Sequence, residues 1–199
     1  MASIRNVCVY CGSGIGRDPA YARAADELGR ALADNGVGLV YGGGSVGLMG
    51  RVARAAKQAG GHVAGIIPRF LKEREVMLAD VDDLVITADM HERKRLMFER
   101  SDAFVALPGG IGTLEEVVEM MTWAQLGQHD KPIALLDING FWAPLVELLG
   151  HMRAEAFIRE GFDVPFEVVA RVEDVVPRLR AACSAAAGRA AEEGVLGRL

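Results

Sequence analysis

Short apolar runs rich in β-branched residues alternate along this chain with longer segments whose apolar residues recur every three or four positions. The short runs lack the polar alternation of a half-exposed strand, which predicts strands buried on both faces of a parallel sheet. The predicted strands cover residues 4–10, 37–41, 62–67, 84–87, 103–107 and 132–137. The predicted helices cover residues 19–35, 47–59, 90–101, 113–126, 141–152 and 173–183. This alternation indicates an α/β fold with a doubly wound, mainly parallel sheet and helices on both faces.

The chain has 199 residues, and a domain commonly has about 150. No internal repeat or low-complexity linker divides the sequence, so we expect a single α/β domain over residues 1–183. Residues 184–199 are rich in alanine and glycine and have little to bury. They are predicted to form a flexible C-terminal tail.

The charge and hydropathy of the chain argue against two classes of binding partner, nucleic acids and membranes. The 22 Lys and Arg residues are outnumbered by 27 Asp and Glu residues, which gives a net charge of −5. This balance argues against a nucleic-acid binder of the usual basic kind and against polybasic attachment to membranes. No apolar run approaches the ~20 residues of a membrane span, and no secretory signal is apparent at the N-terminus. We therefore expect a soluble, cytoplasmic protein with neither nucleic acid nor membrane among its partners.

The three cysteines, an odd number, do not form a disulfide framework. Cys8 and Cys11 do form a Cys-x-x-Cys pattern, which is compatible with a redox or zinc site. If residues 4–10 form a strand, positions three apart point to opposite faces, an unsuitable geometry for a chelate or a disulfide. We therefore interpret these cysteines as two small, partly buried side chains.

Three glycine-rich loops each follow a predicted strand. They are Cys11-Gly-Ser-Gly-Ile-Gly16, Gly42-Gly-Gly-Ser-Val-Gly47 and Pro108-Gly-Gly-Ile-Gly-Thr113. In an open parallel sheet, ligands bind beyond the carboxyl ends of the strands, where glycine lets the backbone approach an anion and helix starts offer free N–H groups. Glycines can also serve only to turn the chain, but three such loops at one sheet edge favour a phosphate-bearing ligand. The candidate contacts are Ser13, Gly42, Gly43, Gly44, Gly109, Gly110, Ile111, Gly112 and Thr113.

The second loop matches the dinucleotide fingerprint at Gly42, Gly44 and Gly47. That fingerprint also needs an acidic residue at the end of the next strand, which binds the ribose 2′-hydroxyl. The next predicted strand ends at Ile67 and no carboxylate follows before Glu73, which argues against NAD and a redox enzyme that uses it. The Gly-Lys-Ser or Gly-Lys-Thr of a Walker loop is absent, so ATP hydrolysis of that kind is not expected.

The predicted helix over residues 90–101 carries two cations on its apolar side. Helical spacing places both Arg93 and Lys94 beside Met90 and Met97. Two cations on an apolar face are costly unless they meet an anion. The alternative is that both side chains extend past their neighbours to water, which suits Lys94 better than Arg93.

Thr113 followed three residues later by Glu116 matches a capping box, a structural device at the start of a helix. A second interpretation starts from the crowding of Glu115, Glu116 and Glu119 beside an anion-attracting loop. A phosphate repels a carboxylate, so carboxylates here are better suited to a ribose hydroxyl or a water molecule. Roles of that kind fit cleavage at a sugar carbon.

Three of these segments together resemble the LONELY GUY (LOG) family of cytokinin riboside 5′-monophosphate phosphoribohydrolases. They are Tyr41-Gly-Gly-Gly-Ser-Val-Gly-Leu-Met-Gly50, Met90-His-Glu-Arg-Lys94 and Pro108-Gly-Gly-Ile-Gly-Thr-Leu-Glu-Glu116. The resemblance runs from about Val7 to the segments 123–127 and 129–132, and more loosely to Gly161. The combination is specific, whereas a lone Gly-Gly-x-Gly-Thr would not be, and no motif position departs from the family pattern.

The resemblance implies a Rossmann-like fold, a homodimer, and hydrolysis of the N-glycosidic bond of AMP or of N6-substituted forms such as isopentenyl-AMP. By their places in the motifs, Arg93 and Glu116 are implied to be the catalytic pair. Substrate contacts are implied at Glu75, Lys94, Glu115, Thr122 and the stretch from Gly110 to Glu116. We expect no cofactor and no metal, since His62, His91, His129 and His151 lack the spacing of metal ligands.

Other functions stay open on such a fold. A non-catalytic nucleotide or cofactor carrier, as in related molybdenum-cofactor carrier proteins, would use the glycine loops equally well but gains little from Glu116. Some family members are labelled lysine decarboxylases, and the four lysines of this chain argue against a pyridoxal-phosphate enzyme of that kind. Met120, Met121 and Trp123 crowd one predicted helix, and we interpret them as core rather than as an interface.

Overall fold

The computed structural model describes residues 4–72 and 80–196, with side chains up to residue 186. Seven strands form one sheet in the order β4-β3-β2-β1-β5-β6-β7, and every neighbouring pair is parallel. The predicted α/β fold with a doubly wound parallel sheet is therefore confirmed. The strands are Asn6–Tyr10 (β1), Gly38–Tyr41 (β2), Val63–Pro68 (β3), Asp83–Thr87 (β4), Ala103–Ala106 (β5), Ile133–Leu136 (β6) and Glu167–Val169 (β7).

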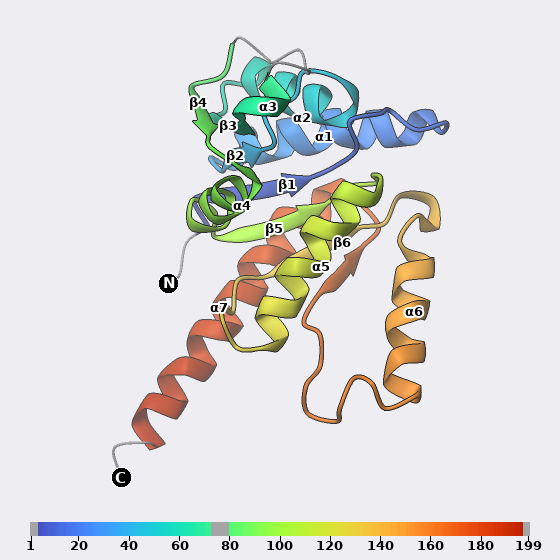
Figure 1. Cartoon of the computed structure of the whole chain (residues 1–199). Coiled ribbons are helices and arrows are strands. Elements are labelled where there is room, and N and C mark those ends of the chain that lie inside the picture. The colour runs from blue at the N-terminus through green and yellow to red at the C-terminus, as the bar shows by residue number, and fades with distance from the viewer. Residues whose placement is uncertain (1–3, 73–79, 197–199) are drawn as a thin grey trace.

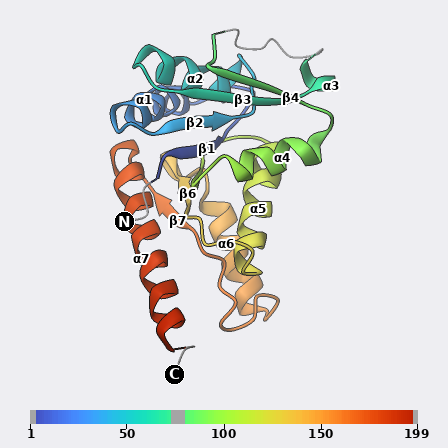
Figure 2. The same cartoon turned by 90° about the vertical axis from the view of Figure 1, so that its left-hand side faces the viewer.

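Helices cover both faces of this sheet (Figure 1, Figure 2). They are Pro19–Asp34 (α1), Gly47–Gln58 (α2), Arg69–Lys72 (α3), Met90–Glu99 (α4), Ile111–Gln125 (α5), Ala143–Ala154 (α6) and Val172–Leu196 (α7), with a 3-10 turn at Ile138–Gly140. One apolar core lies between the sheet and α1, α2 and α7, and the other lies between the sheet and α4, α5 and α6. Successive residues of a strand point to opposite faces, so Val9 enters the first core and Tyr10 the second.

The same alternation separates the two cysteines of the Cys-x-x-Cys pattern. Cys8 packs in the core under α4 and α5, whereas Cys11 packs in the core under α1 and α2. Both are free and buried, as expected, and burial raises the pKa of each thiol. A thiol that stays protonated is neither a good nucleophile nor a good metal ligand, so both cysteines serve the fold.

The order of the strands determines where a ligand can approach. From β1 the chain winds outward through β2, β3 and β4, and it then returns to the middle of the sheet to add β5 beside β1. The boundary between β1 and β5 is the topological switch point, where sheets of this kind leave a crevice beyond the strand ends. Tyr10 pairs with Ala106 across this boundary, so the loops that start at Cys11 and Pro108 leave the sheet side by side.

Each predicted strand and helix is present, and the differences concern short or terminal elements. β7 and α3 have three and four residues and are too short to produce a periodic pattern. The last helix continues past Cys183 to Leu196, because alanine-rich sequence favours helix, so residues 184–196 are helical rather than irregular. The domain boundary at residue 183 stays a prediction. Within the described part of the chain, no helix is long and apolar enough to cross a membrane.

A glycine allows α1 and α2 to pack closely. Gly29 is buried in α1, and a Cβ atom there would overlap the carbonyl oxygen of Val52 and come within 2.8 Å of the amide nitrogen of Ala56. Both atoms belong to the backbone of α2. An added side chain can therefore be accommodated only by moving one helix away from the other.

We expect Gly29→Ala to lower the free energy of unfolding by about 1–3 kcal/mol, because the methyl group pushes the two helices apart. Gly150→Ala is the matched control, since Gly150 lies in α6 with open space around an added Cβ. Alanine favours an exposed helix by up to ~1 kcal/mol, so the control should be neutral or stabilising. Urea denaturation measures both, and equal effects would contradict the close packing of α1 on α2.

Candidate active site

A buried ion pair joins α4 to α5. Nη1 of Arg93 lies 3.0 Å from Oε1 of Glu116, and the two side chains are only 10% and 12% exposed. The prediction that Arg93 faces the apolar side of its helix and meets an anion there is confirmed. The alternative, in which the Arg93 side chain extends to water, is wrong.

The sheet and α4 fix the plane of the Arg93 guanidinium. Nε donates a hydrogen bond over 3.2 Å to the carbonyl oxygen of Ile66 in β3. Nη1 lies 3.9 Å from the sulfur of Met90, one turn earlier in α4, in addition to its contact with Glu116. Because a guanidinium is planar, contacts at two of its three nitrogens set the direction of the whole group.

Burial and neighbouring charges act on Glu116 in opposite directions. Burial raises the pKa of its carboxyl group, and the charge of Arg93 lowers it. Glu115 and Glu119 raise it and Lys94 lowers it, with a net pKa above the ordinary value of 4.5. Such a carboxylate takes up a proton more readily than an exposed one, which suits a general base.

Lys94 extends from the same side of α4 and also meets carboxylates. Its Nζ atom donates to Glu115 and lies 3.4 Å from both carboxylate oxygens of Glu119. Burial lowers the pKa of Lys94, but the bond to Glu115 and the charge of Glu119 raise it more, so the ammonium group stays charged. Arg93 and Lys94 thus bring two positive charges to this cluster. The three carboxylates of α5 that they contact bring three negative charges, which leaves a net charge of −1.

The three glycine-rich loops come together beyond the strand ends, as predicted. The amide of Gly12 donates to the carbonyl oxygen of Pro108 over 3.1 Å, which ties the first loop to the third. The amide of Leu48 donates to the carbonyl oxygen of Gly12 over 3.0 Å, which ties the second loop to the first. Gly47, with a φ of 61°, packs on the backbone of Ser13, where a side chain has no room.

The helices that start beside these loops differ in whether their first N–H groups are free. The start of α2 is occupied, because the amide of Leu48 donates to Gly12, and the start of α1 is capped by Asp18, which accepts from Ala20 over 2.8 Å. α5 starts after Gly110, which has no capping side chain, and its first amides have no acceptor among the residues described. Free N–H groups and the positive end of the helix dipole make this start suitable for an anion.

The start of α5 also corrects the interpretation of Thr113. The helix begins at Ile111, so Thr113 lies inside the first turn and is not the N-cap. Its side chain is buried against Gly109, and Glu116 contacts Arg93 instead of returning to the backbone. The capping box is therefore wrong, and the crowding of carboxylates is the informative feature of this segment.

A cavity of about 300 Å³ opens between the first and third loops. Ser13 and Gly110 line it from the two loops, and Tyr21 and Phe141 pack edge-on at 5.7 Å along its side. The other lining residues are Gly12, Gly14, Ile15, Gly16, Leu48, Pro108 and Gly109. No sequence pattern indicated Tyr21 or Phe141, because they meet only when α1 packs beside the segment after β6.

The remaining predicted contacts differ in where they lie. The glycines at positions 42–44 are buried, whereas Ile111 and Gly112 are exposed at the start of α5. Thr122 is exposed farther along α5, where its hydroxyl donates to the backbone one turn earlier. Glu75 lies outside the described residues.

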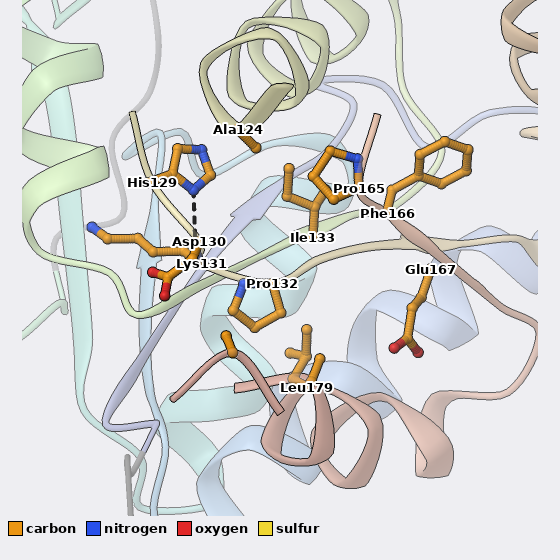
Figure 3. Close-up of a pocket in the computed structure, with 12 residues that line it drawn as sticks. Ala124, His129, Asp130, Lys131, Pro132, Ile133, Pro165, Phe166, Glu167 and Leu179 are labelled. Atoms are coloured by element: carbon orange, nitrogen blue, oxygen red, sulfur yellow. Dashed lines mark hydrogen bonds between the residues drawn. The ribbon is translucent and has the colours of Figure 1, made fainter. Parts of the chain in front are cut away.

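A second cavity, of about 380 Å³, lies at the opposite edge of the sheet, between the segments that precede β6 and β7 and one face of α7 (Figure 3). The ring of His129 accepts a hydrogen bond from the amide of Lys131 over 3.1 Å and lies 3.0 Å from the Met120 carbonyl oxygen. The Lys131 amine donates to the Phe98 carbonyl oxygen over 2.7 Å. These basic groups are engaged within the protein, and no predicted site residue lines this cavity, so the candidate site is the one at the glycine loops.

Comparison with known proteins identifies relatives of this chain. A family model described as "Possible lysine decarboxylase" matches residues 49–179. The chain is 47% identical over 180 residues to the cytokinin riboside 5′-monophosphate phosphoribohydrolase LOG of Oryza sativa, covering 87% of this chain and 74% of that protein. It is 43% identical over 189 residues to the phosphoribohydrolase LOG1 of Arabidopsis thaliana, which has the same description, covering 89% and 86%.

Among solved structures, the molybdenum cofactor carrier protein of Chlamydomonas reinhardtii has a TM-score of 0.68 at 23% identity, covering 90% of this chain and 98% of that chain. At that identity the likeness concerns the fold alone. The family model spans the segments that form the ion pair and the third glycine loop, and the curated relatives match most of the chain. The chain therefore belongs to the LOG family.

Proposed function

We propose that this protein hydrolyses the N-glycosidic bond of adenosine 5′-monophosphates, releasing adenine or an N6-substituted adenine together with ribose 5-phosphate. AMP and isopentenyl-AMP are the expected substrates, since the relatives are named for cytokinin riboside 5′-monophosphates. The observation that carries the proposal is the buried pair of Arg93 with Glu116, because Glu116 lies on α5, the helix whose start is free to bind an anion. An anion site and a carboxylate on one helix suit a substrate whose phosphate and scissile bond belong to one sugar.

The proposed phosphate site is the start of α5. The phosphate oxygens accept hydrogen bonds from the free amides of residues 110–113, and the helix dipole favours their charge. Ser13 and Gly110 both line the cavity between the first and third loops, and Ser13 offers a hydroxyl from the first loop. An added Cβ would overlap Thr113 at Gly109 and come within 3.0 Å of Ile67 at Gly43, so these glycines allow the loops to pack closely around the site.

Cleavage of the bond between C1′ and N9 builds positive charge on the ribose, as in glycoside hydrolysis. Glu116 stabilises this charge through a ribose hydroxyl or orients the attacking water. The water oxygen bonds to C1′, the electrons of the broken bond leave with the base, and the proton lost by the water balances the proton gained by the base. Arg93 anchors the phosphate or assists the departing adenine, and Lys94, Glu115 and Thr122 complete the substrate contacts.

A carrier of nucleotides or cofactors is the alternative function on this fold. Glycine loops and a free helix start serve a carrier as well as an enzyme. Glu116 does not serve a carrier, because a carboxylate near a phosphate weakens the binding of that phosphate. The same carboxylate serves an enzyme, because it can stabilise an oxocarbenium-like transition state. The likeness to a molybdenum cofactor carrier stands at 23% identity and supports only the shared fold.

The lysines of this chain do not support the decarboxylase named in the description of the matching family model. An enzyme that uses pyridoxal phosphate needs a lysine amine that is free to form a Schiff base. Lys57 and Lys94 bond to carboxylates, and Lys131 bonds to a backbone carbonyl. The fourth, Lys72, is exposed on the short helix α3, away from the candidate site residues of α4 and α5, and it lines neither of the two cavities described above.

We also propose that the protein acts as a homodimer in the cytoplasm. Met120 and Met121 are buried, as expected, so they belong to the core. Other apolar side chains are exposed nearby. Leu126 directly follows α5, Leu148 lies on α6, and Phe157 and Phe162 lie in the segment after α6. Gln125 of α5 donates to the carbonyl oxygen of Phe162 over 2.8 Å, so these parts adjoin and provide an apolar surface for a second copy. The three unpaired cysteines suit a reducing compartment.

Incubation of the purified protein with AMP or isopentenyl-AMP, without metal or cofactor, is expected to release the free base, measured by chromatography. Arg93→Ala and Glu116→Ala should each lower kcat about 10²–10⁴-fold, the usual contribution of a positioned catalytic group. Arg95→Ala is the matched control, because Arg95 is exposed on α4, the helix of Arg93, and its ion pair among the described residues is with Glu99. Near-normal release by both site variants would overturn the mechanism, and a bound but intact nucleotide in the wild-type protein would favour the carrier.

The pH dependence of kcat/KM should report the ionisation of Glu116. The mechanism needs its carboxylate, so the rate falls as pH drops through a pKa above 4.5. Lys94→Met removes a charge that lowers this pKa and should move the acid limb to higher pH. Glu119→Gln removes a charge that raises it and should move the limb to lower pH. Shifts in the same direction, or no shift in either variant, would contradict the assignment of the limb to Glu116.

A further inference from the structure

The guanidinium of Arg93 also has a neighbour at Nη2, its third nitrogen, and that neighbour is a glycine. A Cβ atom added to Gly42 would overlap Nη2 of Arg93 and lie 3.6 Å from its Cζ atom. On its other side the same Cβ would come within 3.2 Å of the sulfur of Met49. The bare Cα of Gly42 is thus the surface on which the guanidinium rests.

Backbone conformation does not explain why position 42 is a glycine. Gly43 has a φ of 82° and Gly47 a φ of 61°, values that L side chains rarely adopt. The φ of Gly42 lies outside that region, so the backbone at position 42 accepts any residue. What excludes a side chain there is a side chain from another helix, Arg93 of α4.

We propose that Gly42 is a positioning residue for Arg93, which it holds against Glu116 by leaving room for Nη2. Three contacts then define the guanidinium: the Ile66 carbonyl oxygen at Nε, Glu116 at Nη1, and the Gly42 Cα at Nη2. The inference rests on the proposed function, because it gives Gly42 a role in catalysis through Arg93. It also changes the expected role of Gly42 from a substrate contact to a support for the catalytic pair.

A methyl group at position 42 would displace whichever of its surroundings moves most easily. Ile66 contributes a backbone atom of a central strand, whereas the Arg93 guanidinium is the far end of a flexible side chain. The guanidinium therefore yields, and a rotation away from Gly42 moves Nη1 away from Glu116. The fold keeps its strands and helices, and the catalytic pair loses its alignment.

The test combines kinetics with a stability cycle. Gly42→Ala should lower kcat for AMP about 10- to 100-fold, the cost of a displacement of about 1 Å in a catalytic group, with a smaller change in KM. Gly150→Ala, which adds the same methyl group in open space on α6, should keep the wild-type kcat. In urea denaturation, Gly42→Ala should destabilise the wild-type protein and should cost clearly less in an Arg93→Ala background, where the guanidinium is absent and the contact with the sulfur of Met49 remains.

Each outcome of this cycle is decisive. If the wild-type protein cleaves AMP and Gly42→Ala cleaves it equally fast, the inference is wrong and the proposed function stands. If the wild-type protein cleaves neither AMP nor isopentenyl-AMP, the proposed function fails, and the stability cycle still tests the contact. If Gly42→Ala does not fold, folding of the Gly42→Ala/Arg93→Ala double variant supports the inference, and its failure to fold overturns it.

Discussion

The buried ion pair between Arg93 and Glu116 is the interaction on which the rest of this site depends. Moving two charges out of water costs several kcal/mol per ion, and only close pairing with further hydrogen bonds offsets that cost. The Ile66 carbonyl oxygen supplies such a bond to Arg93, and Lys94 adds a second positive charge near Glu116. The pair therefore requires β3, α4 and α5 to be in place together, which makes the site a product of the whole fold.

The three glycine loops have different roles around that pair. Gly12 and Gly47 let the first two loops pack on each other, and their contact uses the amide of Leu48 at the start of α2. Asp18 occupies the start of α1 in the same way. The start of α5 after Gly110 remains open, at the switch point between β1 and β5 where the fold leaves a crevice. Of the three helix starts beside these similar loops, one is thus left open to an anion.

Local spacing predicted most of the fold, because the pattern of each strand and helix depends on residues close in the sequence. The pairing of Arg93 with Glu116 was implied only by the resemblance to the LOG family. The three- and four-residue spacing around Arg93 was enough to place it on the apolar side of α4. It could not show that Leu48 meets Gly12, or that Gly42 lies against Arg93, since these contacts arise when separate loops and helices pack. The capping box at Thr113 failed for a local reason, because the helix starts two residues earlier, after a glycine.

The central claim is that one helix, α5, binds the phosphate of a nucleotide at its start and presents Glu116, paired with Arg93, to the glycosidic bond of the same molecule. Comparison of AMP with adenosine tests this most directly, because adenosine has the same bond and lacks the phosphate. The account predicts a kcat/KM about 100-fold or more higher for AMP, since binding energy from the phosphate is used to align the reacting bond. Equal values for the two compounds, or no cleavage of either, would contradict it.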